Sequence, residues 1–319
     1  MRVVLAPMEG VMDPLMRQVF TEIGGYDLCV TEFVRVVNQC LPEKVYRRLC
    51  PELAQGGATL AGTPVRVQLL GQSPQWMAEN AAFASELGSP GIDLNFGCPA
   101  KSVNRSNGGA VMLKTPEQLH QVVKAVRAAV PDHLPVTAKV RLGWDSCDNA
   151  MEIADAAASG GADELAIHAR TKADGYRAER INWARIKPIA QALSIPVIAN
   201  GEIWNRQDAL NCLEQSGCQD IMLGRGALAV PNLANVVRGE SDRFDWYQVV
   251  ELMANYAQRE IDGEKWIYFP NRIKQWLRYI IIQYPEAEPF FRQLRVLRDV
   301  DEIIATLHKE GERAQRALA

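Results

Sequence analysis

Short runs of apolar and β-branched residues alternate with longer segments whose apolar positions follow a helical period. The short runs are Val3–Ala6, Leu28–Thr31, Val65–Leu69, Ile92–Asn95, Val136–Val140, Leu165–His168, Val197–Ala199 and Ile221–Leu223. Repeated strand–helix alternation predicts a parallel sheet of the α/β class, and eight strands is the number that closes a TIM (β/α)8 barrel. An open, doubly wound sheet is the structural alternative, but no G-x-G-x-x-G follows the first run to support it.

The segments between the runs carry helix signals. The expected helices include Gln75–Leu87, Pro116–Val130, Met151–Ser159 and Gln207–Ser216. Thr115 stands before Pro116, which predicts a threonine N-cap followed by a proline in the first turn. The long stretch between Pro42 and Pro64 is expected to carry extra helix.

The alternation stops after the GRGAL stretch at Gly224–Leu228. From about Arg243 to Ala319 the pattern is helical and rich in Trp, Tyr and Arg. We therefore expect a barrel catalytic domain over residues 1–242, followed by a small all-helical domain over residues 243–319. A length of 319 residues suits that combination.

Composition limits the class of protein. The chain is 48% hydrophobic and 23% charged, which provides a large core and argues against disorder. No secretory signal is visible at the N-terminus, and no apolar stretch approaches the roughly 18 residues of a membrane span. We expect a soluble, cytoplasmic protein that does not contact membranes.

The net charge of −3 argues mildly against a nucleic-acid partner, but the charge is unevenly distributed. Residues 265–298 contain two acidic residues, Glu286 and Glu288, and seven basic ones. The basic residues are Lys265, Arg272, Lys274, Arg278, Arg292, Arg295 and Arg298. A local charge of +5 is what a polyanion such as RNA would bind.

Seven cysteines without a C-x-x-C pair make disulfide scaffolding and a structural metal site improbable, and no metal is expected. Most of these thiols are expected to be small buried apolar residues. Cys98 differs because it lies in the loop N-F-G-C-P, between Gly97 and Pro99. A free thiol is mostly protonated at neutral pH and can act as a general acid, although a buried structural cysteine is the alternative.

The active site of a TIM barrel lies at the carboxyl ends of its strands. Those ends carry Pro7, Met8, Glu9, Gln68, Asn95, Lys139, Arg141, His168, Arg170, Asn200, Gly201, Glu202, Gly224 and Arg225. Because strand residues alternate between faces, Lys139 pairs with Arg141, and His168 pairs with Arg170, at the barrel mouth. Such a set favours an anionic ligand over a solvated rim.

The NGEI and GRG segments follow the seventh and eighth runs, where this fold usually binds phosphate. Gly201, Gly224 and Gly226 would let backbone N–H groups approach an anion, and Arg225 would add a charged contact. Simple turn glycines are the alternative. The phosphate could belong to a substrate or to FMN. Lys139 favours the flavin, whose reduced ring is anionic.

These residues together resemble the tRNA-dihydrouridine synthase family. The stretches APMEGVMD, DLNFGCPAK, GGAVML, KVRLGWD, IHARTK, IANGEI and GRGAL resemble its motifs in order, and the tail resembles its RNA-binding domain. PMEG, NGEI and RIKQWL resemble the bacterial C subgroup, which acts on uridine 16 of the D-loop.

The resemblance implies that NADPH reduces FMN and that the C5=C6 bond of a tRNA uridine is then reduced, with Cys98 protonating C5. The implied cofactor-binding residues are Pro7, Met8, Glu9, Gln68, Lys139, His168, Asn200, Gly201, Glu202, Gly224 and Arg225. The implied substrate-binding residues are Arg35, Asn95, Arg141, Arg170, Tyr176, Arg272, Lys274 and Tyr279. A monomer is the family-based expectation.

The tail interleaves cations with Trp266, Tyr268, Trp276 and Tyr279, which suits RNA, although these rings could instead form a core. Trp276 and Leu277 are the expected core members. Arg272 and Lys274 project about 200° apart on a helix, so we expect one to contact RNA and the other to brace the barrel.

Two alternative functions remain open at this point. One is an FMN-barrel dehydrogenase that acts on a free pyrimidine, and the other is a tRNA-binding protein without catalysis. The basic aromatic tail argues against the first, and the Cys98 loop argues against the second.

Overall fold

Eight parallel strands close into a barrel in which each strand pairs with its neighbours in sequence and β8 pairs with β1. The computed structural model describes residues 1–263 and 266–318. The strands are β1 (Val3–Leu5), β2 (Leu28–Arg35), β3 (Val65–Leu70), β4 (Ile92–Asn95), β5 (Val136–Gly143), β6 (Glu164–Thr171), β7 (Val197–Asn200) and β8 (Asp220–Leu223). The predicted TIM barrel is confirmed, and the open-sheet alternative is wrong.

Alternation along the strands builds two apolar layers. Val4 belongs to a small cluster inside the barrel, whereas its neighbours Val3 and Leu5 belong to the large core between strands and helices. The inner cluster consists of Val4, Ala6, Leu28, Val30, Ala166, Ile198 and Met222. Two-sided burial explains why the strands read as continuous apolar runs.

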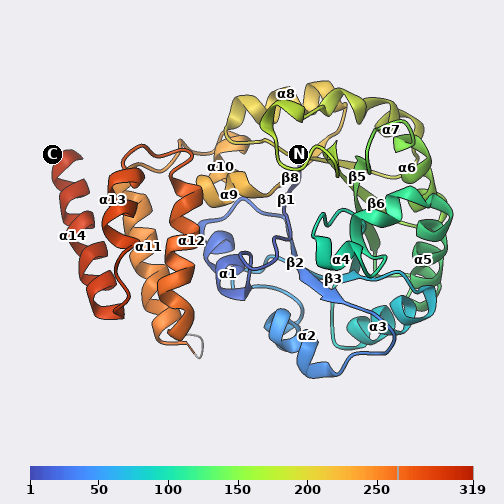
Figure 1. Ribbon diagram of the computed structural model, residues 1–319, viewed down its shortest axis with the longest axis horizontal. Coiled ribbons are helices and arrows are strands. Elements are labelled where there is room, and N and C mark those ends of the chain that lie inside the picture. The colour runs from blue at the N-terminus through green and yellow to red at the C-terminus, as the bar shows by residue number, and fades with distance from the viewer. Residues whose placement is uncertain (264–265, 319) are drawn as a thin grey trace.

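Helices cover the outside of the barrel (Figure 1). They are α1 (Pro14–Ile23), α2 (Glu43–Leu49), α3 (Pro74–Glu86), α5 (Pro116–Ala129), α6 (Ala150–Ser159), α7 (Lys187–Ala192), α8 (Arg206–Ser216), α9 (Arg225–Ala229) and α10 (Leu233–Arg238). The short α4 (Lys101–Asn104) belongs instead to the loop after β4. Helix α2 and the 3-10 turn Pro51–Gln55 confirm the extra helix expected after β2. Thr115 occupies the N-cap of α5 and Pro116 stands in its first turn, which confirms the prediction, although the threonine side chain makes no capping hydrogen bond.

Within the described part of the chain, four further helices lie beside the barrel, next to α1 and α9 (Figure 1). They are α11 (Trp246–Ile261), α12 (Phe269–Ile280), α13 (Ala287–Leu294) and α14 (Val300–Leu318). Trp276 of α12 packs edge-on against Phe20 of α1, with ring centroids 6.0 Å apart. Its indole N–H donates to the carbonyl of Leu228 at 3.1 Å. Trp276 and Leu277 are buried, as expected, so α12 is docked firmly on the barrel.

All seven cysteines are free thiols, and four of them, Cys29, Cys50, Cys212 and Cys218, are buried. Among the described residues no cluster of three or more His, Cys, Asp or Glu side chains could hold a metal ion. Within the same residues, no helix combines the length and the apolar character needed to cross a membrane.

Candidate active site

A cavity of about 670 Å³ opens at the carboxyl ends of the strands, a size typical of small-molecule sites. The predicted site residues that line it are Pro7, Met8, Glu9, Gln68, Asn95, Cys98, Lys139, Arg141, His168, Tyr176, Asn200, Gly201, Glu202, Gly224, Arg225 and Tyr279. Phe33 and Trp204 also line it, and nothing in the sequence singled them out. Residues from every strand end of the barrel therefore meet in one place.

Lys139 is a partly buried cation in the wall of the cavity. Its Nζ donates to Oδ1 of Asn200 at 3.0 Å, and Nδ2 of Asn200 donates to the carbonyl of Met222 at 2.8 Å. Burial, and then the charge of Arg141, lower the pKa of Lys139 to about 8. The hydrogen-bond partner is a neutral amide, so an anionic ligand beside this lysine would restore its proton affinity.

The lowered pKa of Lys139 predicts a specific pH dependence of stability. An ordinary lysine titrates at 10.5, so between pH 8 and 10.5 the unfolded chain keeps a proton that the folded chain has lost. Stability from this group therefore rises with pH in that window, by about 1.4 kcal/mol per pH unit.

Chemical denaturation of ligand-free protein, compared with Lys139→Met, isolates this contribution from the other groups that titrate. We expect the difference in free energy of unfolding, wild type minus variant, to increase at each step from pH 8.5 to 10. Parallel pH profiles would show that Lys139 titrates normally.

Arg141 connects the loop after β4 with the end of β6 and the loop that follows it, at the cavity rim. Its Nε donates to the Gly97 carbonyl at 2.8 Å, and Nη1 donates to the Thr171 carbonyl at 3.2 Å. Its guanidinium carbon lies 5.4 Å from the ring centroid of Tyr176, and that of Arg225 lies 4.9 Å from the same centroid. Tyr176 is thus held by two cations, while its ring stays half exposed and available to a planar ligand.

His168 is buried in the cavity wall. Burial, followed by the charges of Arg141 and Lys139, holds the pKa of His168 well below its ordinary value. At neutral pH the imidazole is therefore uncharged and offers one donor and one acceptor. His168 lies against Gly201, where a Cβ atom would come within 2.8 Å of the imidazole Cδ2.

The NGEI loop is strained and tightly held. Gly201 has φ +120°, and Glu202 has φ 52°, a left-handed conformation that is uncommon for a residue with a side chain. The Glu202 carboxylate accepts from Nε1 of Trp204 at 3.0 Å and forms an ion pair with Arg225. It also lies 2.8 Å from Nη2 of Arg170.

Arg170 differs from the expectation that it reaches the barrel mouth beside His168. Its side chain is wholly buried and is not among those that line the cavity. The acidic residue of the neighbouring loop explains this, because Glu202 draws the guanidinium sideways into an ion pair. Arg170 thus acts on the cavity through Glu202.

The thiol of Cys98 is half-buried at the cavity wall. The Cys98 N–H donates to Oδ1 of Asn95 at 2.9 Å, and its carbonyl accepts from the N–H of Ala110 at 3.0 Å. Burial raises the pKa of Cys98, against a smaller opposing effect from the backbone of Ala100. The sulfur therefore keeps its proton at neutral pH and can donate it.

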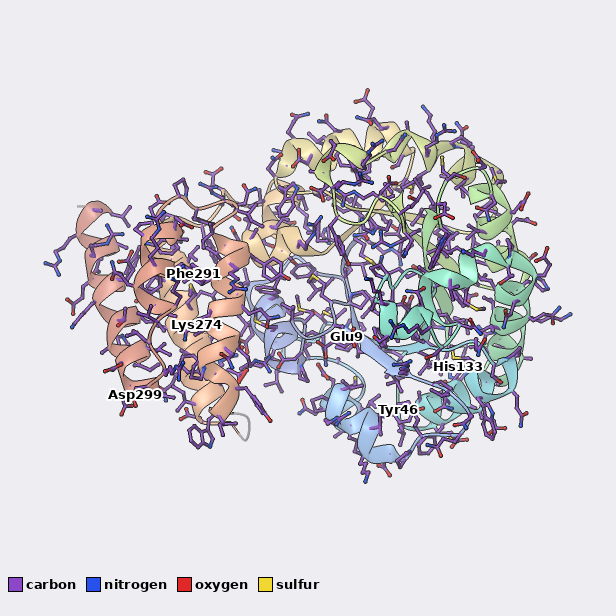
Figure 2. All side chains as sticks on the ribbon, viewed as in Figure 1. Glu9, Tyr46, His133, Lys274, Phe291 and Asp299 are labelled. Carbon is purple, nitrogen blue, oxygen red and sulfur yellow. The ribbon has the colours of Figure 1, made fainter. Side chains whose placement is uncertain are left out.

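Three predicted tRNA contacts, Arg35, Arg272 and Lys274, do not line the cavity. Arg35 ends β2 and donates to the Ser102 carbonyl at 3.0 Å, which ties it to α4 beyond the Cys98 loop. Figure 2 shows Lys274 on the added helices, well apart from Glu9 on the barrel. Lys265, part of the predicted basic patch, lies outside the described residues.

Arg272 pairs with acidic side chains. It forms an ion pair with Asp13, the N-cap of α1, and lies 2.8 Å from the carboxylate of Glu260. The Nζ of Lys274 instead donates to the Leu297 carbonyl within the added helices. Of these two residues, Arg272 is therefore the one that braces the barrel.

Comparison with known proteins adds independent findings. Residues 4–314 match the family model described as dihydrouridine synthase. A protein of Vibrio vulnificus named tRNA-dihydrouridine(16) synthase is 56% identical over 317 residues, covering 99% of this chain and 100% of that protein. A Pasteurella multocida protein of the same name is 58% identical, covering 94% of this chain and 96% of its own length.

Among solved structures, histamine dehydrogenase from Rhizobium sp. 4-9 superposes with a TM-score of 0.56 over 81% of this chain and 48% of that one. Its sequence is 14% identical, so this likeness supports the barrel fold alone.

Proposed function

The chain belongs to the dihydrouridine synthase family, and on that basis we propose that it reduces a uridine of tRNA to 5,6-dihydrouridine. FMN is the proposed cofactor and NADPH the proposed reductant. The names of the relatives favour uridine 16 of the D-loop as the target. The observation that carries the proposal is that one cavity holds the protonated thiol of Cys98 together with the partly buried ammonium of Lys139.

The residues present fit FMN. At Gly224 an added Cβ would meet only the side chains of Ala6 and Met8, both at 3.8 Å, so the backbone is open toward the cavity. Gly224 and Arg225 would hold the phosphate, together with the loop at Asn200, Gly201 and Glu202. Lys139 would face the anionic edge of the flavin ring, where a negative charge would oppose the effect of burial, which lowers the pKa of this lysine.

Other cavity residues would position the ring. Gln68 would bind its polar pyrimidine edge, and Pro7, Met8 and Glu9 would cover it from the loop after β1. The uncharged His168 would serve as a hydrogen-bonding group, since its pKa is too low for a permanent charge.

FMN, once reduced by NADPH, would supply the hydride for C6 of the uracil. Cys98 would supply the proton for C5, which completes the addition of two hydrogens across the double bond. Arg141 and Tyr176 would hold the base at the rim, where the guanidinium favours the negative charge that builds on O4. Extruding the base from its stack costs a few kcal/mol, which the loop of a tRNA reduces.

The helical region over residues 243–319 is proposed to bind the tRNA, with Lys274 and Tyr279 facing it and Arg35 contributing from the barrel. Tyr279 is well placed for this role because it is on α12 and also lines the cavity. We propose further that the protein acts in the cytoplasm as a monomer.

The test begins with the purified protein. We expect it to be yellow and to release FMN, not FAD, on denaturation. Incubation with NADPH should then raise the dihydrouridine content of tRNA taken from a strain that lacks the gene, and mapping should place the product at the D-loop position named for the relatives.

Two controls separate the alternatives. Reduction of free uridine or uridine monophosphate at a rate similar to that of tRNA would indicate a dehydrogenase of free pyrimidines. Binding of tRNA by protein that is colourless and cannot be reconstituted with FMN would indicate a non-catalytic binding protein. Either result contradicts the proposal.

A further inference from the structure

A chain of side-chain hydrogen bonds links the interior of the barrel to the Cys98 loop. Gln68 Nε2 donates to Asp93 Oδ2 at 2.7 Å, and Asn95 Nδ2 donates to Gln68 Oε1 at 2.8 Å. Oδ1 of Asn95 then accepts the backbone N–H groups of Gly97 at 3.0 Å and Cys98 at 2.9 Å. All three side chains are buried, with exposures of 2% for Asp93, 0% for Gln68 and 8% for Asn95.

The strand register explains why these groups meet. Gln68 of β3 lies opposite Asp93 of β4, which lies opposite Thr137 of β5. Asn95 follows Asp93 by two residues and so faces the same side of the sheet. Asp93 therefore anchors a row that runs across adjacent strands and up to the loop.

In this series of hydrogen bonds, the groups at the two ends determine which atom donates and which accepts in every bond. The backbone N–H groups of Gly97 and Cys98 can only donate, so Asn95 must turn its oxygen toward them and its NH₂ toward Gln68. An ionised carboxylate can only accept, so Gln68 must turn its NH₂ toward Asp93. Both requirements are met by a single orientation of each amide.

Each oxygen of the Asp93 carboxyl group accepts a hydrogen bond from a neighbouring side chain. Its second oxygen accepts from the Thr137 hydroxyl at 2.6 Å. Burial raises the pKa of Asp93, while the bonds from Gln68 and Thr137 and the charges of Arg66 and Lys139 oppose that rise.

We propose that Asp93 is a positioning residue for the proton donor: through Gln68 and Asn95 it fixes the backbone of the Cys98 loop. The proposal rests on the proposed function only in taking Cys98 as the donor. Asp93 does not line the main cavity, so it acts at a distance from any ligand. Without the Asp93 carboxylate, the side-chain amide of Gln68 could rotate by 180° and turn its NH₂ toward Asn95. Neither Gln68 nor Asn95 would then be held in a single amide orientation.

Two substitutions at position 93 separate hydrogen bonding from charge. In Asp93→Asn, an amide oxygen can still accept from Gln68 while its NH₂ donates to Thr137, whose hydroxyl can turn toward the Ile92 carbonyl 3.4 Å away. The chain is thus preserved without the negative charge. In Asp93→Leu, a side chain of similar shape offers no acceptor, so the chain loses its anchor.

Thr137→Val is the matched structural control. It removes the hydrogen bond that Thr137 donates to Asp93. It leaves intact the bonds that connect Asp93, Gln68, Asn95 and the Cys98 loop. Thermal unfolding of all three variants, measured in the full-length FMN-loaded protein, shows how much each is destabilised in general.

The primary readout is the rate at which iodoacetamide alkylates Cys98, followed by mass spectrometry of its peptide. We expect Asp93→Leu to speed alkylation about fivefold or more, because a loosened loop exposes the thiol and relieves the burial that raises its pKa. Asp93→Asn and Thr137→Val should stay within about twofold of the wild type.

The second readout is single-turnover reduction of tRNA by enzyme whose flavin has been reduced beforehand. Asp93→Leu should slow it about tenfold or more, since a misplaced donor costs rate even when binding is kept. Asp93→Asn should restore it.

The proposal would be overturned if Cys98 of Asp93→Leu were alkylated at the wild-type rate. It would also be overturned if Asp93→Asn were as impaired as Asp93→Leu in both readouts, because the negative charge of Asp93 and not its hydrogen bonding would then matter. If the wild-type protein reduces no tRNA, the proposed function fails, while the alkylation rates still decide whether Asp93 positions the loop.

Discussion

Replacing Cys98 with alanine is expected to slow reduction of tRNA about 10²–10⁴-fold, the range over which a positioned general acid contributes. The rate at which NADPH reduces the flavin should stay within about twofold, because that half-reaction needs no proton on uracil C5. The physical basis is the raised pKa of Cys98, which keeps its sulfur protonated at the cavity wall. Stopped-flow absorbance of the flavin, first with NADPH and then with tRNA, measures the two steps separately.

Cys147→Ala is the matched control. Cys147 is partly buried like Cys98, but it does not line the cavity. We expect it to change neither half-reaction. A loss below about tenfold in Cys98→Ala would remove this thiol from the role of acid.

The barrel and most of the cavity could be predicted from sequence because both depend on short-range periodicity. Each strand appeared as an apolar run, and the period of two placed Lys139 and Arg141 on one face. The same rule places Asp93 and Asn95 on one face of β4, but nothing in the sequence indicated a role for Asp93. The two side chains that donate to Asp93, Gln68 and Thr137, come from other strands, so only the register revealed the connection.

Arg170 and Arg272 show why other roles were not predictable. Both have the charge expected of an anion-binding residue, and both form an ion pair with a carboxylate from another part of the fold. Glu202 stands in a neighbouring loop, and Asp13 precedes Arg272 by more than half of the chain. The sequence shows both acidic residues, but no local pattern indicates which arginine each of them pairs with. Charge counts along the sequence therefore overestimate the free positive charge of the tail.

The position of Arg272 predicts that Arg272→Ala will destabilise the protein far more than it alters contact with tRNA. The side chain is 20% exposed, and its partners Asp13 and Glu260 are 12% and 3% exposed. Breaking one side of a buried ion pair typically costs about 3–5 kcal/mol, because the remaining charge stays in a poorly hydrated place. We expect the free energy of unfolding, measured by urea denaturation, to fall by about 3 kcal/mol, at the low end because Asp13 still caps α1.

Lys274→Ala separates this effect from RNA binding. Lys274 is on the same helix and donates to one backbone carbonyl, so its removal should change stability by no more than about 0.5 kcal/mol. If it contacts a phosphate, the variant should bind tRNA more weakly, and the slope of log affinity against log salt should shrink by about one unit. Arg272→Ala, assayed at a temperature where it remains folded, should keep the wild-type slope. A stable Arg272→Ala variant with a reduced salt slope would instead make Arg272 the RNA contact and contradict its role as a brace. The brace joins the added helices to the start of α1, which directly follows the cavity-lining loop of Met8 and Glu9.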